Sequence, residues 1–469
     1  MIRSFLADRR SFVLFSLMFG VVCLLNINYC LLRSARNALA VADIGGGAQV
    51  IPIYDLCGTI PGAILMVFLL TRLLNRFSIH QVFLITLSVF LGFFLVFSFA
   101  VYPSLHLWKE VILNWDWLWG HKYLAILLPQ GAAMVFFVMA ELWKIALLTV
   151  LFWGLVNQYM PLGEAKKLYA PLMLGTSIGT MLSGPIVKLC TSDALSHGLW
   201  SRSLNLLVLS LLLIGVLVAW LYTLLCKQFS SEKALQIQEE KPKESPLSLR
   251  ECLKACLQSK YLSLLGWVTI ADYIAYALGE MVFLDVLKQK YPDPRQYCDY
   301  NGQLSFWYGL LTAVSALLIT PILVKRCRWV VASLVTPVCL VLTEGAFFFT
   351  LWFPFKVLPL DLLVFLGSVF FCCVRAAKYT LFDTSKELSF LLLPPLEKMQ
   401  GKLIIDGICS RMGRGGASFL SIGLVQIFGG IMASAVAAGA IAITVSVSCV
   451  FSTLKLGLLV EKQTKQKKA

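Results

Sequence analysis

The hydrophilic stretch KQFSSEKALQIQEEKPKESPLSLRECLKACLQSK, residues 227–260, divides an otherwise strongly apolar sequence into two halves. It contains seven basic and five acidic residues, and apolar segments long enough to cross a membrane lie on both sides of it. Its length and composition are typical of a cytoplasmic linker between two membrane-embedded bundles. We therefore predict a linker at residues 227–261.

The apolar segments on the two sides of this linker predict an all-α membrane protein. A transmembrane helix needs about 20 mostly apolar residues, and by this measure about six segments precede the linker and about six follow it. The expected spans are 12–34, 50–71, 81–102, 131–156, 168–188, 204–226, 262–286, 304–324, 329–352, 358–377, 415–430 and 433–454. This 6+6 arrangement is the layout of the major-facilitator type, in which two parallel six-helix repeats bind substrate between them.

The same pattern gives the predicted domain organisation. We expect an N-terminal six-helix bundle at 1–226, a C-terminal six-helix bundle at 262–455 and a basic cytoplasmic tail at 456–469. The first apolar segment is too long for the core of a signal peptide, so we expect a permanent span there. Because no Ser-rich transit peptide precedes it, we expect a protein of the bacterial inner membrane rather than a plastid precursor.

The composition excludes an ordinary soluble protein. Hydrophobic residues make up 59% of the chain, charged residues only 14%, and the mean hydropathy is +0.80. A net charge of +15 would suit a nucleic-acid partner, but most of the 40 Lys and Arg residues fall on the side of both termini. This imbalance predicts cytoplasmic termini and no nucleic-acid partner.

Sequence motifs of common enzyme and metal sites are missing. GxxxxGK[ST] and HExxH do not occur, the four histidines do not recur at ligand spacing, and the 14 cysteines contain no CxxC. We therefore expect a protein that is not an enzyme, with no cofactor and no metal site. The segment GTSIGTMLSG, Gly175–Gly184, instead predicts close helix packing through its GxxxG spacing.

Charged residues inside the expected spans fall mainly on the first, fourth, seventh and tenth of them. Each such charge costs several kcal/mol unless it faces a partner or a water-filled cavity. In proteins of this layout the same four spans line the central cavity, so we expect a polar pathway there. These residues are Arg33 and Arg36, Glu141 and Lys144, Asp272 and Glu280, and Arg375 and Lys378. Glu344, in the ninth span, lies outside this pattern.

The spacing of the first two pairs allows two interpretations each. Glu141 and Lys144 stand three apart with the acid first, the order that favours an ion pair on one helix. This pair is either a neutralised structural pair or one that opens when a phosphate competes for the lysine. Arg33 and Arg36 also share a face, which fits either an anion entrance or two interfacial arginines that snorkel outward.

One face of the seventh expected span is polar, whereas its other faces are apolar. The residues at helical spacing on this face are Thr269, Asp272, Tyr276 and Glu280. Because carboxylates repel an anionic substrate, we expect Asp272 and Glu280 to pair with cavity arginines in the empty state or to bind protons. Simple packing against a neighbouring helix is the alternative.

A second basic stretch runs from Arg375 to Gly416 and carries seven basic residues. Arg375 and Lys378 are three apart, so they share a helix face at the end of the tenth span. Further on, SRMGRGGAS places Arg411 and Arg414 among glycines, where the backbone can approach a phosphate and arginine can bind it bidentately. The alternative is a cytoplasmic loop that follows the positive-inside rule.

Several segments resemble the bacterial and plastidic ATP/ADP translocases. The most specific match is KYTLFDTSKELSFL followed by GKLIIDGICSRMGRGGAS. LLRSARNALAV with the GGGAQVIPIYDLCGTIPGAILMVFLLTRLLNRFS segment resembles the first two spans of that family. FVMAELWKIALLTVLFWGLVNQYMPLGEAKKLYAPLMLG and ADYIAYALGEMVFLDVLKQKYPDPRQYCDYNG resemble its fourth and seventh spans with the loops that follow them. The matches occur in the order of the family and extend over nearly the whole chain.

The resemblance also implies roles for individual residues. Charged transport residues of the family fall on Arg36, Glu141, Glu280 and Arg414. Two of these positions carry Arg where the family has Lys, which exchanges a compact ammonium for a planar fork. Asn37 and Ser34 replace an acidic residue and a proline that the family usually has beside Arg36.

The resemblance implies a nucleotide transporter, and we expect ATP/ADP antiport by alternating access. The alternatives are a proton-coupled importer of nucleoside triphosphates, with Asp272 or Glu280 binding the proton, or an exchanger of another nucleotide such as NAD. A membrane scaffold or a membrane-embedded enzyme is the alternative from another class. We expect nucleotides and the lipid bilayer as partners, and a monomer. The expected substrate-binding residues are Arg33, Arg36, Lys144, Arg375, Lys378, Arg411 and Arg414, and the expected gating or ion-pair residues are Glu141, Asp272 and Glu280.

Overall fold

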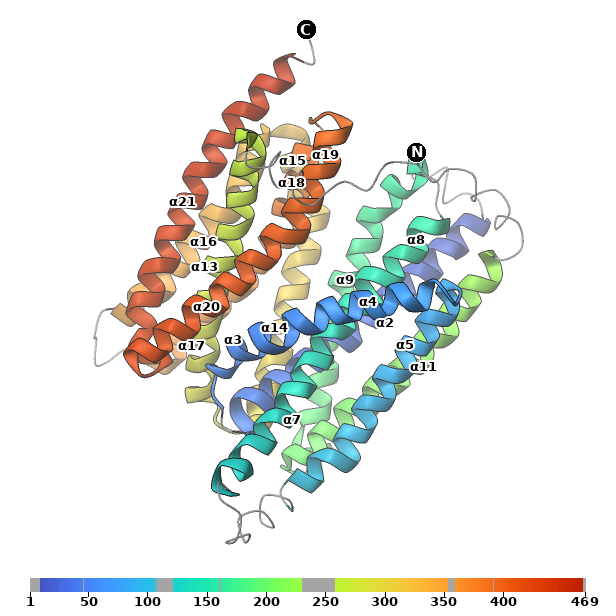
Figure 1. The fold of residues 1–469 in the computed structure, drawn as a ribbon, viewed down its shortest axis with the longest axis vertical. Coiled ribbons are helices and arrows are strands. Elements are labelled where there is room, and N and C mark those ends of the chain that lie inside the picture. The colour runs from blue at the N-terminus through green and yellow to red at the C-terminus, as the bar shows by residue number, and fades with distance from the viewer. Residues whose placement is uncertain are drawn as a thin grey trace. The chain divides into compact units, whose positions relative to one another are not determined.

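The computed structural model describes residues 9–466, except 45, 106, 108–120, 160–161, 230–257, 353–358 and 391. Throughout these residues every regular element is a helix (Figure 1). Several of the α-helices continue directly into a π-helical segment. The all-α prediction is therefore confirmed for this part of the chain.

The helices form two compact units that do not follow the chain from end to end. Unit 1 contains Met1–Gly47, Cys57–Lys241 and Tyr291–Leu310, and unit 2 contains Ala48–Leu56, Pro242–Lys290 and Leu311–Ala469. The chain thus returns to unit 1 along the first part of α14 (Pro294–Val314), which contacts α9 (Leu162–Thr191).

Unit 1 is organised around α2 (Arg9–Asn37). This helix contacts α9, α11 (Trp200–Phe229) and α7 (His121–Trp143), and its residues Val21, Val22 and Leu25 are fully buried. The other elements that belong to this unit are η1 (Ala38–Asp43), α4 (Ile60–Leu74), α5 (Ile79–Val96), η3 (Phe97–Val101), η4 (Lys144–Phe152), α8 (Trp153–Tyr159) and α10 (Asp193–Ser196).

Unit 2 is organised around α13 (Lys260–Lys290). This helix contacts α21 (Ile431–Gln466), α20 (Ser410–Phe428) and α17 (Leu360–Ala377), and most of its side chains from Tyr261 to Leu287 are buried. The other elements of this unit are α3 (Val50–Tyr54), η5 (Ser315–Ile319), α15 (Thr320–Arg326), α16 (Trp329–Trp352), η6 (Lys378–Phe382), α18 (Asp383–Phe390), α19 (Pro395–Lys402) and η7 (Leu403–Cys409). The π-helical segment η2 (Asp55–Thr59) lies where the chain passes from unit 2 to unit 1.

Ten helices in the described part of the chain are long and apolar enough to cross a membrane. They correspond to ten of the expected spans. The two remaining expected spans coincide with α13 and α20, which are not among these ten. Both carry charged residues within the helix, such as Asp272 and Glu280 on α13.

The tenth expected span is longer than predicted. We expected it to end at residue 377, where charged residues begin, but α17 continues through η6 and α18 to Phe390. The expected loop before residue 415 is also largely helical, because α19, η7 and the start of α20 occupy it. The prediction was wrong here because it ended the helix at charges that, as described below, have partners on other helices.

The glycines of α9 lie where this helix approaches its neighbours most closely. A Cβ atom on Gly179 would lie 2.4 Å from the carbonyl oxygen of Cys23 on α2. A Cβ atom on Gly184 would lie 2.7 Å from the carbonyl oxygen of Gly302 on α14. The packing role predicted for GTSIGTMLSG is therefore confirmed.

Most of the predicted linker, residues 227–261, lies outside the described residues. On its two sides α11 ends at Phe229 and α13 begins at Lys260. At the end of the chain, α21 continues to Gln466 and includes the first part of the predicted tail.

Candidate functional site

One charged group in unit 1 joins α2 to α7. Arg36, near the end of α2, forms an ion pair with Glu141 on α7, and their side chains are only 9% and 8% exposed. The hydroxyl of Tyr29 donates a hydrogen bond to Oε1 of Glu141 at 3.3 Å. The guanidinium of Arg36 lies 4.2 Å from the centroid of the Phe137 ring. Two buried charges thus compensate each other inside apolar helices.

Lys144 and Arg33 lie close to the same group. Lys144 is the first residue of η4, and its Nζ atom lies 5.3 Å from the centroid of the Tyr29 ring. Arg33 is one turn before Arg36 on α2 and is buried. Arg33 follows Tyr29 by four residues on α2, so the two side chains share a face of this helix. The predicted residues of unit 1 therefore lie around one tyrosine. Glu141, which lies near Lys144 in sequence, forms its ion pair with Arg36 on another helix.

In unit 2 a deeply buried ion pair joins α13 to η6. It is formed by Asp272 and Lys378, whose side chains are 3% and 8% exposed. Nζ of Lys378 also lies 3.5 Å from the centroid of the Tyr273 ring. Lys378 is the first residue of η6, as Lys144 is the first residue of η4.

A second pair joins α13 to α17 about two turns away. Nη2 of Arg375 lies 2.7 Å from Oε1 of Glu280, and the side chains are 14% and 24% exposed. Nε of Arg375 donates a hydrogen bond to the hydroxyl of Tyr276. The guanidinium lies 4.3 Å from the centroid of the Phe371 ring. Both carboxylates of the predicted polar face of α13 are therefore held by cations.

The two units use the same construction. An ion pair connects α2 to α7 in unit 1 and α13 to α17 in unit 2, and these helices correspond to the first and fourth expected spans of each half of the sequence. In both halves a lysine, Lys144 or Lys378, stands three residues after the charged residue of the fourth span and begins a π-helical segment. π-helical segments inside α-helices occur frequently at functional sites. The charge order is reversed, because Arg36 is on the first helix in unit 1 whereas Arg375 is on the fourth in unit 2.

The arginines of SRMGRGGAS lie on α20 in different surroundings. Cζ of Arg414 lies 5.9 Å from the centroid of the Tyr273 ring, whereas Arg411 is exposed. A Cβ atom on Gly413 would lie 2.8 Å from Cβ of Tyr273 and 3.0 Å from the carbonyl oxygen of Ile270. Gly413 thus lets α20 approach α13 and brings Arg414 to the ring.

We expect Gly413→Ala to reduce activity, because the added methyl group must displace α20 or Tyr273. Overpacking of this kind costs about 1–3 kcal/mol. Gly416→Ala is the matched control, since a Cβ atom there meets only Ile274, at 4.0 Å. The measurement is the rate of the expected ATP/ADP exchange, per molecule of each variant, in reconstituted vesicles. Equal rates for both variants would contradict the assigned role of Gly413.

The charges of the LFDTSKE motif are paired within unit 2. Nζ of Lys386 lies 2.8 Å from Oδ1 of Asp406 and 3.3 Å from Oδ1 of Asp383. Glu387 pairs with Lys402 at 2.8 Å. These contacts connect α18 to α19 and η7, so the motif contributes to the packing of this end of unit 2.

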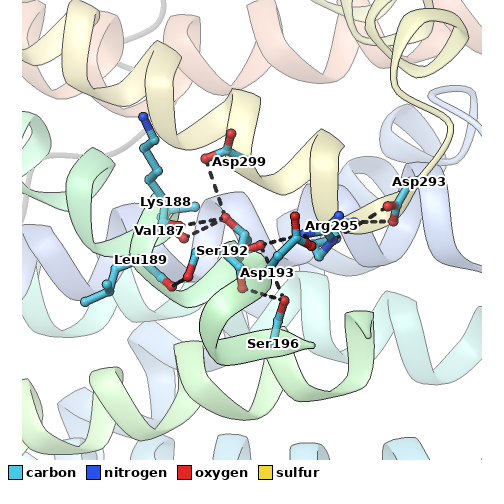
Figure 2. Close-up of polar contacts among 10 residues, drawn as sticks. Val187, Lys188, Leu189, Ser192, Asp193, Ser196, Asp293, Arg295 and Asp299 are labelled. Atoms are coloured by element: carbon cyan, nitrogen blue, oxygen red, sulfur yellow. Dashed lines mark hydrogen bonds and ion pairs between the residues drawn. The ribbon is translucent and has the colours of Figure 1, made fainter. Parts of the chain in front are cut away.

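A further polar network in unit 1 connects α9 and α10 to α14 (Figure 2). Nη1 of Arg295 donates hydrogen bonds to the carbonyl oxygen of Thr191 at 3.1 Å and to Oδ1 of Asp193 at 2.5 Å. The hydroxyl of Thr191 donates a hydrogen bond of 3.5 Å to Oδ1 of Asp299. Because these contacts lie next to the close approach of Gly184 and Gly302, they tie the end of α9 to the beginning of α14.

A cavity of about 260 Å³ lies beside this network. Its charged lining residues are Lys188, Arg295, Asp193 and Asp299, and the rings of Tyr291 and Tyr300 stack at 5.0 Å in its wall. The two cations and two carboxylates balance, so this cavity has no excess of positive charge to attract a polyanion. We interpret the network as a structural tie between the helices.

The aromatic partners of the charged residues were not predicted from the sequence. Tyr29, Phe137, Tyr273 and Phe371 lie in apolar segments that are rich in aromatic residues, which gives no signal of a cation contact. One pattern was available: Tyr29 and Tyr273 each lie within one turn of a predicted charged residue in sequence. The polar tie around Arg295 was also missed, because these residues were assigned to a loop.

Among the residues that the structure describes, no group of three or more His, Cys, Asp or Glu side chains could hold a metal ion.

Sequence comparisons match the chain to known transporters. The family model of the TLC ATP/ADP transporter matches residues 7–459. ADP,ATP carrier protein 1 of Chlamydia muridarum is 30% identical over 447 residues, which are 89% of this chain and 82% of that protein. ADP,ATP carrier protein 2, chloroplastic, of Arabidopsis thaliana is 30% identical over 431 residues, which are 87% of this chain and 68% of that protein.

Solved structures with a similar fold are also transporters. A POT family transporter in complex with 5-aminolevulinic acid has a TM-score of 0.59 at 9% identity, covering 94% of this chain and 96% of that one. A nucleoside transporter has a TM-score of 0.55 at 14% identity, covering 94% and 99%. At these identities the likeness concerns the fold alone, and it confirms the major-facilitator-like arrangement predicted from the sequence.

Proposed function

Because the chain belongs to the TLC ATP/ADP transporter family, we propose that it exchanges ATP for ADP across a membrane by alternating access. It is a multi-pass membrane protein and a transporter, not an enzyme. The proposed substrate-binding cations are those predicted from the sequence, with Arg36, Lys144, Arg375, Lys378 and Arg414 as the principal ones.

The observation that carries the proposal is the set of ion pairs Arg36–Glu141, Lys378–Asp272 and Arg375–Glu280, of which the first two are buried and the third is partly buried. In each pair a carboxylate holds a cation that can also form charge-assisted hydrogen bonds with a phosphate. When a phosphate oxygen replaces the carboxylate, the cation stays neutralised. Binding a polyphosphate then gives each cation a new anionic partner, and the released carboxylate has to turn to water or bind a proton.

These pairs also account for obligatory exchange in the proposed mechanism. While the site is empty, each pair ties two helices of one unit together. A bound nucleotide takes over the cations and releases the ties, so the helices can rearrange only when the site is occupied. An empty carrier would then return slowly, and ATP would cross in one direction only when ADP crosses in the other.

The test is counter-exchange in proteoliposomes that contain the purified protein. We expect internal ADP to accelerate the uptake of labelled ATP strongly over vesicles without internal nucleotide, and we expect an uncoupler to leave the rate unchanged. Competition by GTP, CTP, UTP and NAD reports the base and nucleotide selectivity. Uptake that ignores internal nucleotide would contradict antiport.

One observation favours proton-coupled import as the second candidate. Glu344 on α16 is fully buried; its Oε2 accepts a hydrogen bond from Ser446 at 2.8 Å, and its Oε1 has no hydrogen-bond partner among the described residues. The predicted proton carriers Asp272 and Glu280 are both paired with cations, so Glu344 is the better candidate. Two results together would favour this mechanism. An uncoupler would abolish uptake by the parent protein, and the remaining uptake by Glu344→Gln would not respond to the uncoupler.

We further propose cytoplasmic termini, because most basic residues fall on their side in the expected topology. A bacterial inner membrane, a monomeric working unit and the absence of a nucleic-acid partner belong to the same proposal. Labelling of cysteines introduced near each terminus, in intact cells and in inverted vesicles, tests the orientation.

A further inference from the structure

Tyr273 brings two cations of unit 2 to a single ring. Lys378 on η6 approaches the ring centroid to 3.5 Å with its Nζ atom, and Arg414 on α20 approaches it to 5.9 Å with Cζ. Tyr273 itself is on α13, next to Asp272, and its side chain is half-buried. Three elements that are distant in the sequence therefore meet at one aromatic side chain.

The two groups that contact Lys378, the carboxylate of Asp272 and the ring of Tyr273, differ in what a phosphate can do to them. The carboxylate of Asp272 is an anion, so a phosphate competes with it directly for the lysine. The ring attracts cations through its quadrupole and cannot be replaced by a phosphate in this way. A phosphate that opens the ion pair therefore does not compete for the contact between ring and lysine.

Lys378 and Arg414 are both cations, and their common attraction to the ring of Tyr273 offsets part of the repulsion between them. The close approach that Gly413 permits between α20 and α13 places Arg414 at this ring. A polyphosphate has several charged oxygens and can contact two cations at once. The same ring thus arranges two cations for one polyanion.

We propose that Tyr273 is a positioning residue that holds Lys378 and Arg414 together for the polyphosphate of the substrate. It keeps Lys378 in place after a phosphate has displaced Asp272. The inference rests on the proposed nucleotide exchange and adds to it a residue that acts through the two cations rather than by ion pairing.

The test compares Tyr273→Phe and Tyr273→Leu in the full-length protein reconstituted in vesicles. Tyr273→Phe keeps the ring and is expected to exchange ATP and ADP like the parent. Tyr273→Leu is expected to raise the KM for ATP by about twofold to thirtyfold, the range that corresponds to loss of a cation–π contact. The maximal rate should change less, because the cations themselves remain.

A double-mutant cycle separates positioning from general packing. The substitution Arg414→Gln is made in the parent and in Tyr273→Leu. The KM for ATP is then measured for the parent, the two single variants and the double variant. If the ring positions Arg414, the substitution of Arg414 must have a smaller effect in the Tyr273→Leu background. Effects that simply multiply would overturn the proposal, as would equal defects in Tyr273→Phe and Tyr273→Leu.

Two controls complete the design. Phe419→Leu removes an aromatic ring from α20 at a position that is 72% exposed, and it should leave the KM unchanged. Tyr273→Met fills a similar volume without a ring and replaces Tyr273→Leu if that variant does not reach the membrane. Absence of nucleotide exchange in the parent protein would refute the proposed function, whereas normal exchange with an unchanged KM in Tyr273→Leu would refute only this inference.

Discussion

Replacing Lys378 with glutamine is expected to destabilise the protein and to stop nucleotide exchange. The substitution leaves the carboxylate of Asp272 without its cation at a position where the side chain is only 3% exposed. Removing one partner of a buried ion pair costs about 3–5 kcal/mol, because the remaining charge stays buried and uncompensated. The midpoint of thermal unfolding in detergent and the exchange rate in vesicles should therefore both fall.

The double variant Asp272→Asn/Lys378→Gln separates stability from transport. Its two neutral side chains can hydrogen-bond to each other, so the unfolding temperature should return most of the way to that of the parent. Exchange should remain absent, because the cation proposed to bind phosphate is missing. Full exchange by this double variant would show that the pair serves only the fold.

A matched control is the ion pair of Lys290 and Asp361, which is more exposed than that of Lys378 and Asp272. Their side chains are 25% and 75% exposed, and ion pairs of this kind contribute only about 0–1 kcal/mol. Lys290→Gln should therefore change neither the unfolding temperature nor the exchange rate to a comparable extent. The contrast with Lys378→Gln attributes the effect to burial rather than to the loss of a lysine as such.

The positions of the charged residues could be predicted from the sequence, as could the pairing of Glu280 with an arginine, but the other individual partners could not. Arg36, Glu141, Glu280 and Arg375 are conspicuous because the segments around them are apolar. Helix spacing pointed to Lys144 as the partner of Glu141, whereas the structure pairs Glu141 with Arg36 on another helix. Spacing rules describe contacts within one helix, and the packing of α2 on α7 is decided by the whole bundle.

For the fold as well, features that depend on the local sequence were predicted, whereas a feature that depends on contacts between helices was not. Hydrophobic length located the helices, and the glycines of α9 predicted close packing correctly. The end of the tenth span was misplaced, because the charges after residue 377 read as the start of a loop. Arg375 and Lys378 can lie inside a continuous helix since Glu280 and Asp272 on α13 compensate them. A single sequence carries no direct sign of that compensation.

The tie between α9 and α14 leads to the other prediction with a large effect. By sequence α9 belongs to the first predicted bundle and α14 to the second, and alternating access requires the bundles to move against each other. Arg295 nevertheless connects the beginning of α14 to Thr191 at the end of α9 and to Asp193 on α10. We therefore expect this tie to break in one of the states of the transport cycle.

Covalent closure of the tie should stop exchange. In the variant Asp193→Cys/Arg295→Cys, a short bifunctional methanethiosulfonate reagent can join the two positions, which are in direct contact in the parent. Exchange by the cross-linked protein should fall to the background of protein-free vesicles and return after reduction. Each single-cysteine variant, treated with the same reagent, controls for reaction at native thiols such as the exposed Cys57.

The result distinguishes a moving contact from a static one. If α9 and α14 stay together throughout the cycle, the cross-link removes no necessary motion, and the treated double variant will exchange as fast as the reduced one. If they must separate, the block will be complete even though the charged residues around Tyr29 and Tyr273 are unchanged. Loss of exchange together with preserved binding of ATP to the cross-linked protein would place the defect in the conformational step rather than in the substrate site.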